Sequence, residues 1–187
     1  MPTSAIAILA AGQAQRFGSA KQLANYRGKP LLETVIDNCT AVENATVYLV
    51  LGAHREQIKA RLNLQRVTIL ENKGWAEGIA SSIRTTVQAL QSQYDGILFV
   101  AGDQPLVKTE DLADLLTVGK NNPEKICCAS YDNTIGIPAL FPKIFYSELL
   151  ALQDDRGAKR VLLDQAQNVL TLNIPGAAED IDSLSDL

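Results

Sequence analysis

The sequence predicts an α/β domain in which a mostly parallel sheet is covered by helices on both faces. Short apolar runs alternate along the chain with helix-like segments, which is the pattern of βαβ units. The apolar runs are continuous rather than alternating, as expected for strands buried on both faces. The chain has 187 residues, of which 47% are hydrophobic and 20% charged. This is enough to bury one core, and we expect residues 1–187 to form a single domain.

The predicted strands share apolar, often β-branched residues, and several of them stop at a glycine. We expect them at 5–9, 45–51, 67–70, 96–101, 126–130, 137–141 and 169–174. The run 137–141 follows a turn-like segment at 132–134, so it is expected to pair antiparallel with a neighbour.

The predicted helices are recognised by apolar residues at spacings of three and four and by their start signals. Pro30 is expected to open the first helix, because its fixed φ suits a first turn. Thr109 is expected to cap another helix with its hydroxyl, since two acidic residues follow it and suit the helix dipole. Further helices are expected at 54–62, 79–90, 142–152 and 158–165.

Composition excludes several classes of protein. The 17 basic and 21 acidic residues give a net charge of −4, which argues against a protein that binds duplex nucleic acid. The three cysteines form no C-x-x-C pair, and His54 is the single histidine, so disulfide frameworks, common zinc sites and His-based triads are not expected. No signal peptide or membrane span is expected, and together these features favour a cytoplasmic protein.

Charge is distributed unevenly along the chain. Residues 1–32 contain four basic residues and no acidic one, so they carry +4 against −8 for the remainder. No basic residue follows position 160, whereas acidic residues continue to the end. This asymmetry indicates an anion site near the N-terminus.

The segment 9–21 follows the first predicted strand, where ligands of open α/β sheets bind. It combines small residues and two glycines with Arg16 and Lys21, and a loop of free amides with fixed cations suits a polyphosphate. It matches neither G-x-G-x-x-G nor the P-loop pattern. The alternative interpretation is a turn with two solvated cations.

Acidic residues occur at two places in the sequence that we expect to lie near this loop. Asp103 ends an apolar strand, where a carboxylate beside a phosphate site is a natural ligand for Mg²⁺. Asp180 and Asp182 are separated by one residue and would complete such a site. The alternatives are a turn aspartate at 103 and the acidic first turn of a last helix at 179–183.

Polar residues also occur at the start of the predicted helix 79–90. Gly78, Ser81 and Ser82 lie there, and Asn72 precedes them after a strand. Amides and hydroxyls at such a place can hold a nucleotide, and helix capping is the alternative interpretation.

Taken together, these segments resemble a known family. Residues 9–21 resemble the L-A-A-G-x-S-x-R-x-G-x-x-K signature of MobA-like nucleotidyltransferases, and they are most similar to the molybdenum cofactor cytidylyltransferases. Further matches cover nearly the whole chain, at 28–32, 74–78, 81–84, 102–106, 138–142, 155–159 and 180–183.

The resemblance implies a three-layer α/β/α, Rossmann-like nucleotidyltransferase fold and a Mg²⁺-dependent reaction. CMP would pass from CTP to molybdopterin or the molybdenum cofactor with release of pyrophosphate. The product would go on to a molybdoenzyme or its chaperone, and neither duplex nucleic acid nor a membrane is an expected partner.

The same resemblance assigns roles to individual residues of this chain. The nucleotide would contact Leu9, Ala10, Ala11, Gly12, Asn72, Gly78, Ser81 and Ser82. The triphosphate and the transition state would be held by Arg16 and Lys21. Mg²⁺ would bind Asp103 together with Asp182 or Asp180. The acceptor would lie near Gln104, Arg156 and Lys159.

The chain departs from the family pattern at two positions. Ala14 replaces a serine of the phosphate loop, and Ile137 replaces the histidine of a common G-H-P segment. Two alternative functions are therefore retained: a nucleotidyltransferase that uses another NTP or a sugar-phosphate acceptor, and a non-catalytic chaperone that binds the cofactor. Trp75 is expected to pack its loop or to stack on a base, and His54 is expected at the surface or at a cap.

Overall fold

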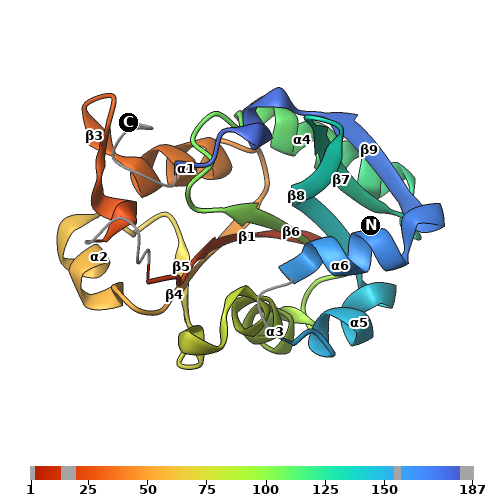
Figure 1. The fold of residues 1–187 in the computed structure, drawn as a ribbon, viewed down its shortest axis with the longest axis horizontal. Helices are drawn as coiled ribbons and strands as arrows, with labels where there is room; N and C mark the ends of the chain where they lie inside the picture. Colours follow the sequence, from red (N-terminus) through yellow and green to blue (C-terminus); the bar gives the residue numbers. More distant parts are fainter. Residues whose placement is uncertain (1–2, 14–19, 154–156, 182–187) are drawn as a thin grey trace.

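A computed structural model of the chain describes residues 3–13, 20–153 and 157–181. Its centre is a seven-stranded sheet with the order β5-β4-β1-β6-β8-β7-β9 (Figure 1). The strands are β1 (Ser4–Ala10), β4 (Thr46–Leu51), β5 (Thr68–Glu71), β6 (Gly96–Ala101), β7 (Ile126–Tyr131), β8 (Thr134–Pro142) and β9 (Val169–Asn173).

Strand direction agrees with the expectation from the sequence. β8 runs antiparallel to both of its neighbours, β6 and β7, and every other pair in this sheet is parallel. In the central pairs, Ile6 of β1 lies level with Val47 of β4 and Leu98 of β6. The parallel strands β1, β4, β5 and β6 therefore end at the same edge of the sheet.

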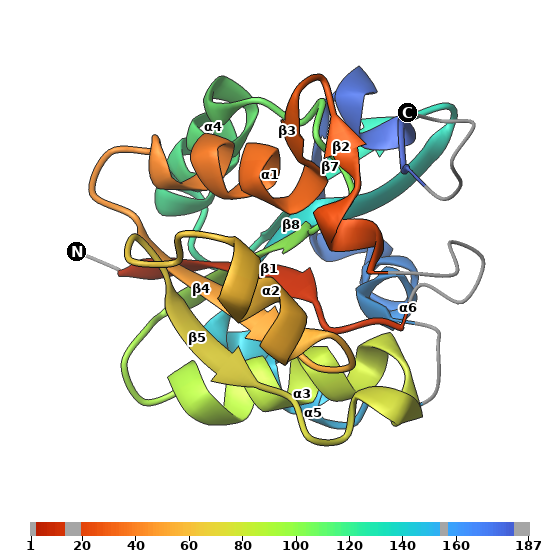
Figure 2. The same cartoon turned by 90° about the vertical axis from the view of Figure 1, so that its left-hand side faces the viewer.

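Helices cover both faces of the sheet, as Figure 2 shows for α1 and α4 on one side and α3 and α5 on the other. The first face is covered by α1 (Leu31–Thr40), α2 (Arg55–Arg61) and α4 (Thr109–Asn121). The second face is covered by α3 (Ile79–Leu90), α5 (Tyr146–Leu150) and α6 (Gly157–Asp164).

Successive side chains of β1 supply the two halves of the core. Ile6 and Ile8 point to the α1 face, whereas Ala5 and Ala7 point to the α3 face, and all four are fully buried. Burial of one such isoleucine stabilises the fold by about 1.5–3 kcal/mol. The predicted three-layer arrangement is confirmed.

The start of α4 differs from its prediction. Thr109 is the first residue of the helix, and its hydroxyl donates to the carbonyl of Asn38 in α1 at 3.0 Å. The residue that closes the first turn is Asp111, whose Oδ2 accepts the N–H of Lys108 at 2.8 Å. The prediction that Thr109 is the cap was wrong, because the hydroxyl found a partner on a neighbouring helix.

Two other predicted boundaries change. Pro30 lies just before α1 and pairs with Asn25 in a hairpin of β2 (Asn25–Tyr26) and β3 (Lys29–Pro30), which the sequence did not predict. The segment 142–152 is not one helix, because Pro142 still pairs with Gly96 as the last residue of β8. A 3₁₀ turn then precedes the short α5.

In its described part, residues 179–181, the acidic C-terminal segment is not helical, and a 3₁₀ turn at Pro175–Ala178 comes before it. In the described part of the chain, no helix has the length and apolar character needed to cross a membrane.

Candidate active site

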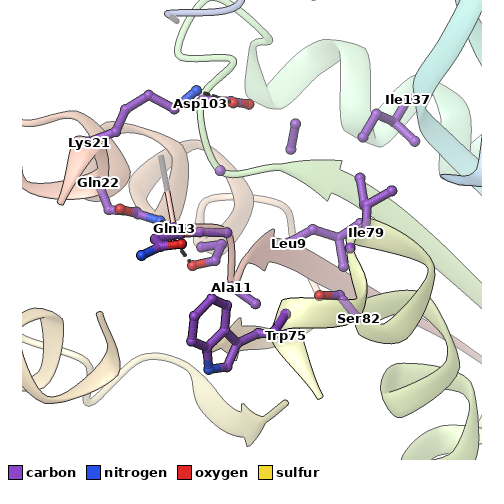
Figure 3. A pocket seen from close by; sticks show the side chains of 16 residues that line it. Leu9, Ala11, Gln13, Lys21, Gln22, Trp75, Ile79, Ser82, Asp103 and Ile137 are labelled. Atoms are coloured by element: carbon purple, nitrogen blue, oxygen red, sulfur yellow. Dashed lines mark hydrogen bonds and ion pairs between the residues drawn. The ribbon is translucent and has the colours of Figure 1, made fainter. Parts of the chain in front are cut away.

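A cavity of about 620 Å³ opens at the carboxyl ends of β1 and β6, beside the first turn of α3 (Figure 3). Its walls come from four places in the chain: residues 9–13 at the end of β1, Ala101–Asp103 at the end of β6, the segment from Trp75 to Ser82, and the pair Lys21 and Gln22. Ile137 of β8 closes the remaining side. This is the edge of the sheet at which the sequence predicted the ligand.

Close packing fixes the wall that follows β1. A Cβ atom on Gly52 would lie 2.5 Å from Cβ of Trp75 and 2.6 Å from the carbonyl oxygen of Ala11. Only glycine permits this approach, which brings the loop of Trp75 against the end of β1. The small, buried side chains of Ala10 and Ala11 form part of the cavity wall here.

Lys21 and Asp103 meet across the cavity, although 82 positions separate them in the sequence. The Nζ atom of Lys21 lies 2.7 Å from Oδ2 of Asp103, and the two side chains are 13% and 29% exposed. Lys21 belongs to the 3₁₀ turn Lys21–Leu23, and Asp103 follows Gly102 at the end of β6. A cation and a carboxylate therefore stand together in a partly buried, water-accessible site.

The C-terminal segment is docked against Asp103. The N–H of Ile181 donates to the carbonyl of Asp103 at 3.1 Å, and the buried Ile181 packs with Tyr26 and Leu31. Gln104 donates from Nε2 to the carbonyl of Ala177 at 2.9 Å. This docking places Asp180 one residue from the backbone contact with Asp103.

Asp180 also influences a tyrosine of β7. Burial raises the pKa of the Tyr131 hydroxyl, and the negative charge of Asp180 raises that pKa further. Asp180 does not line the cavity in the described part of the chain. Asp182, Arg16 and Arg156 lie outside the described residues.

Asn72 is a buried hub behind the wall formed by α3. Its Oδ1 accepts the N–H of Gly74 at 2.9 Å, which turns Nδ2 toward the two serines. Nδ2 donates to the hydroxyls of Ser81 and Ser82 at 2.7 and 3.0 Å. The Ser81 hydroxyl donates in turn to the carbonyl of Gly78 at 2.8 Å.

Ser82 is the member of this group that reaches the cavity. Its oxygen already accepts a hydrogen bond from Asn72, so its own proton is directed to another acceptor. Gly78 is the N-cap of α3 and the Ser81 hydroxyl donates to its carbonyl, so these two residues fit the capping interpretation, whereas Ser82 reaches the cavity. Asn72 and Ser81 support the wall from behind rather than line it.

Two predicted acceptor residues lie away from the cavity wall. Gln104 is 2% exposed and is bonded to Ala177, as described above. Lys159 of α6 donates to the hydroxyl of Thr134 at the start of β8, at 2.8 Å. Of the predicted site residues that the structure describes, those that line the cavity are Leu9, Ala10, Ala11, Gly12, Lys21, Gly78, Ser82 and Asp103.

The donor set fits a hard divalent cation that is shared with a phosphate. Among the described residues, Asp103 supplies the one carboxylate of the cavity wall, and no cluster of three or more His, Cys, Asp or Glu side chains is present. Mg²⁺ is commonly bound by one or two carboxylates together with substrate phosphate oxygens and water. One carboxylate would suffice if a ligand supplied the phosphates.

Thiol chemistry is excluded at this site. Cys39, Cys127 and Cys128 are buried in the core and lie outside the cavity wall. Burial raises the pKa of Cys127 to about 11 and that of Cys128 to about 12, so neither is a thiolate near neutral pH. The prediction that this adjacent pair is part of the core is confirmed.

The sequence missed two residues that contact the segment 10–13. Gln22 lines the cavity, and its only signal was its position directly after Lys21. His54 lies at the N-cap position of α2, in agreement with the expectation of a cap, but its contact with the segment was not predicted: its Nε2 lies 2.9 Å from the carbonyl oxygen of Gln13. Neither role is visible in a local pattern, because each partner is brought close only by the fold.

Comparison with known proteins agrees with this geometry. The family described as the MobA-like NTP transferase domain matches residues 6–169. The bifunctional protein GlmU of Desulfitobacterium hafniense strain Y51 is 32% identical over 143 residues, which cover 73% of this chain and 30% of GlmU. The chain thus spans less than a third of that relative.

The chain is also similar to two proteins that carry other names than GlmU. The nicotine blue oxidoreductase of Paenarthrobacter nicotinovorans is 32% identical over 127 residues, which cover 67% of this chain and 61% of that protein. The crystal structure of Rv0371c from Mycobacterium tuberculosis H37Rv has a TM-score of 0.87 and 26% identity, with 99% and 95% of the two chains covered. A second structure of Rv0371c, in complex with manganese, has a TM-score of 0.82, 24% identity and coverage of 98% and 95%.

Proposed function

The chain belongs to the MobA-like NTP transferase domain family, and from that premise we propose that it transfers CMP from CTP to molybdopterin or its molybdenum form. The reaction would depend on Mg²⁺ and release pyrophosphate. The observation that carries the proposal is the contact between Lys21 and Asp103 in the cavity at the ends of β1 and β6.

The contact suits a metal–triphosphate complex. Lys21 offers a cation for phosphate oxygens, and Asp103 offers a carboxylate for the metal. Because the two side chains touch, a phosphate held by Lys21 would lie beside a metal held by Asp103. Mg²⁺, when bound, would neutralise charge on the phosphates. Manganese in the Rv0371c complex is consistent with a divalent cation in this fold.

The protein has little covalent work to do in such a reaction. Phosphoryl-type transfer depends mainly on positioning the reactants and on stabilising charge. Lys21, with Arg16 as a further proposed cation, would stabilise the charge that develops on the leaving pyrophosphate. The terminal phosphate of molybdopterin is already an anion, so the cavity needs no strong general base, and its wall in the described part contains no histidine.

Hydrogen-bond direction on the α3 side supports a nucleoside. Asn72 makes the Ser82 hydroxyl an acceptor toward itself and leaves the Ser82 proton for an oxygen or nitrogen of a ribose or base. The choice of CTP rests on the small residues Ala10 and Ala11, which resemble the cytidylyl type. Asp182 or Asp180 is proposed as the second metal ligand, and Arg156 and Lys159 as contacts of the acceptor.

An assay with purified protein tests the proposal. CTP, GTP or ATP is mixed with Mg²⁺ and with molybdopterin, its molybdenum form or a panel of sugar phosphates, and pyrophosphate is measured. The proposal expects release with CTP and molybdopterin or its molybdenum form. Release only with GTP or ATP would overturn the nucleotide, and release only with a sugar phosphate would overturn the acceptor. Tight cofactor binding without turnover would favour the non-catalytic chaperone.

A further inference from the structure

Gln22 holds two backbone carbonyls at the end of β1. Its Nε2 donates to the carbonyl of Ala10 at 3.1 Å and to that of Gly12 at 3.2 Å. The side chain is only 6% exposed and lines the cavity, where Figure 3 shows its carboxamide turned toward the segment that carries Ala11 and Gln13. The carbonyls thus fix which end of the carboxamide faces the loop.

The carbonyls of Ala11 and Gln13 are bound by donors from another part of the chain, residues 53 and 54. The carbonyl of Ala11 accepts the N–H of Ala53 at 3.1 Å. The carbonyl of Gln13 lies 2.9 Å from Nε2 of His54, which donates when that nitrogen carries its proton. Four consecutive carbonyls, from residue 10 to residue 13, therefore each face a donor on the protein.

This arrangement has an electrostatic consequence for an anionic ligand. In a trans peptide the carbonyl and the following N–H point in opposite directions. The bound carbonyl oxygens are kept from the phosphates, and the N–H that follows each one points away from its donor: those of residues 11 and 13 away from Gln22, and that of Gly12 away from Ala53. A loop preset in this manner does not have to reorganise when a triphosphate binds.

The cost of the arrangement at Gln22 argues that it serves more than the fold. Within the described residues, the Oε1 atom of Gln22 is buried and has no hydrogen-bond partner. A buried acceptor without a donor is destabilising, and a methionine of similar size would fill the position without one. Such a local conflict is typical of residues retained for a functional site.

We propose that Gln22 and His54 are positioning residues that preset the backbone of residues 10–13 for the phosphates of a nucleoside triphosphate. The proposal rests on the nucleotide site proposed above and adds to it two residues that lie outside the family motifs quoted for this chain. Gln22 acts from the 3₁₀ turn that also carries Lys21, and His54 acts from the residue before α2.

Variants with methionine or glutamine at positions 22 and 54 test the hydrogen-bond donor separately from the size of the side chain. Gln22→Met and His54→Met remove the N–H donor at similar size, and His54→Gln restores a donor at position 54. Trp75 is the only tryptophan and lines the cavity, so its fluorescence reports ligand binding. CTP, CMP and cytidine are titrated with Mg²⁺ into each variant, and kcat and KM are measured by pyrophosphate release.

The expected loss of affinity increases with the number of phosphates in the ligand. Gln22→Met should weaken CTP binding about 10- to 100-fold, because two hydrogen bonds are lost, and His54→Met about 5- to 10-fold. The loss should be smaller for CMP and absent for cytidine. His54→Gln should lie within about 2-fold of the wild type. Gln22→Met also leaves the carbonyls of Ala10 and Gly12 without this donor, so its thermal midpoint should fall by about 2–8 °C while cytidine binding stays intact.

Two results would overturn the inference: unchanged CTP affinity in both methionine variants, or an equal loss for CTP and cytidine, which would indicate general damage to the fold. If the wild-type protein itself binds no nucleoside triphosphate by fluorescence or calorimetry, the proposed function fails first, and the inference fails with it. The wild-type titration therefore separates the two failures.

Discussion

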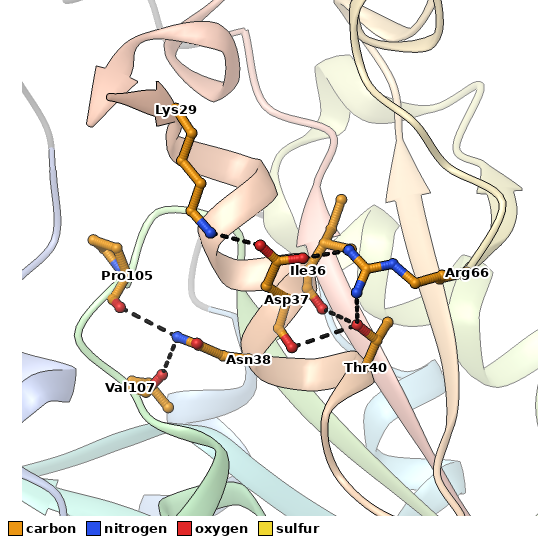
Figure 4. A network of polar contacts seen from close by, with 8 residues as sticks. All are labelled: Lys29, Ile36, Asp37, Asn38, Thr40, Arg66, Pro105 and Val107. Atoms are coloured by element: carbon orange, nitrogen blue, oxygen red, sulfur yellow. Dashed lines mark hydrogen bonds and ion pairs between the residues drawn. The ribbon is translucent and has the colours of Figure 1, made fainter. Parts of the chain in front are cut away.

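Two lysine–carboxylate pairs, formed by lysines only eight positions apart, have different places in the molecule. Lys21 pairs with Asp103 inside the cavity, at 2.7 Å. Lys29 pairs with Asp37 of α1 at 2.5 Å on the outer surface, where Arg66 also binds Asp37 and the hydroxyl of Thr40 (Figure 4). The first pair joins the 3₁₀ turn Lys21–Leu23 to the end of β6, and the second ties the β2–β3 hairpin and the segment before β5 to one helix.

Burial and redundancy distinguish the two pairs. The lysine and aspartate side chains are 13% and 29% exposed in the cavity, against 42% and 36% at the surface. Asp37 has two cationic partners, and an exposed ion pair of this kind contributes about 0–1 kcal/mol to stability. The same residue types therefore stabilise a surface in one place and form a candidate ligand site in the other.

The comparison also corrects the interpretation of the basic N-terminal segment. Of its four cations, Lys21 reaches the cavity, Lys29 pairs on the surface, and the guanidinium of Arg27 lies 5.1 Å from the ring centre of Tyr26. Arg16 lies outside the described residues. The charge excess was thus a weaker guide to the site than the position of each residue after a strand.

The largest effect is expected at Asp103. Asp103→Asn keeps the size of the side chain and removes the charge that a metal needs, so turnover should fall at least about 1,000-fold. Pyrophosphate release measures the loss, and circular dichroism should show a folded protein. Full activity in this variant would contradict the assignment of the metal.

A somewhat smaller effect is expected at Lys21. Lys21→Met keeps the aliphatic stem and removes the cation, and kcat/KM should fall about 100- to 1,000-fold as phosphate stabilisation is lost. The matched control is Lys29→Met, which removes the surface cation of the second pair. If both variants lost activity equally, the distinction between the two pairs would be wrong.

Little effect on activity is expected at Asp37, and its contribution to stability should depend on pH. Burial alone would raise the pKa of Asp37, but hydrogen bonds and charges from Arg66 and Lys29 outweigh it and lower the pKa. The folded-state pKa then lies below the unfolded value, so this contribution is present above about pH 4 and is lost as the pH falls through the folded-state pKa.

Urea unfolding of Asp37→Asn measures this contribution. The variant should be less stable than the wild type by at most about 1 kcal/mol at pH 7. The difference should shrink as the pH falls through the lowered folded-state pKa of Asp37, where the wild-type carboxyl becomes protonated as well. A difference that does not change with pH would mean that packing, not charge, is responsible.

The smallest effect is expected for the three thiols. Burial raises the pKa of each cysteine, so a thiol reagent should not react with the native protein at neutral pH. All three should react after unfolding in denaturant. Rapid labelling of the native protein would show that the core opens at one or more of these cysteines.

Much of the fold could be predicted because it depends on local patterns. Apolar runs gave the strands, and the turn before 137–141 gave the antiparallel direction of β8. The predictions for Thr109 and Pro142 were wrong because their partners, Asn38 and Gly96, lie on distant segments. Local capping and helix signals in the sequence carry no information about contacts with distant segments.

The site was predicted only in its outline. Asp103 and Lys21 were identified by their place after strands, and their contact agrees with that logic. Three features could not be predicted: the hydrogen bonds of Asn72, the docking of Ile181 on Asp103 and the contacts of Gln22. Each joins segments through the tertiary fold and leaves no spacing in the sequence.

The role of Asp103 and Lys21 in holding a metal–triphosphate complex can be tested with a crystal structure that contains CTP and Mn²⁺, in which anomalous scattering locates the metal. We expect a metal peak about 2.1 Å from an oxygen of Asp103, with triphosphate oxygens on the metal and at Lys21 Nζ. The nucleoside should lie beside Ser82, between the end of β1 and the start of α3. A nucleotide bound elsewhere, or a metal that does not contact Asp103, would show that these two residues do not form the nucleotide site.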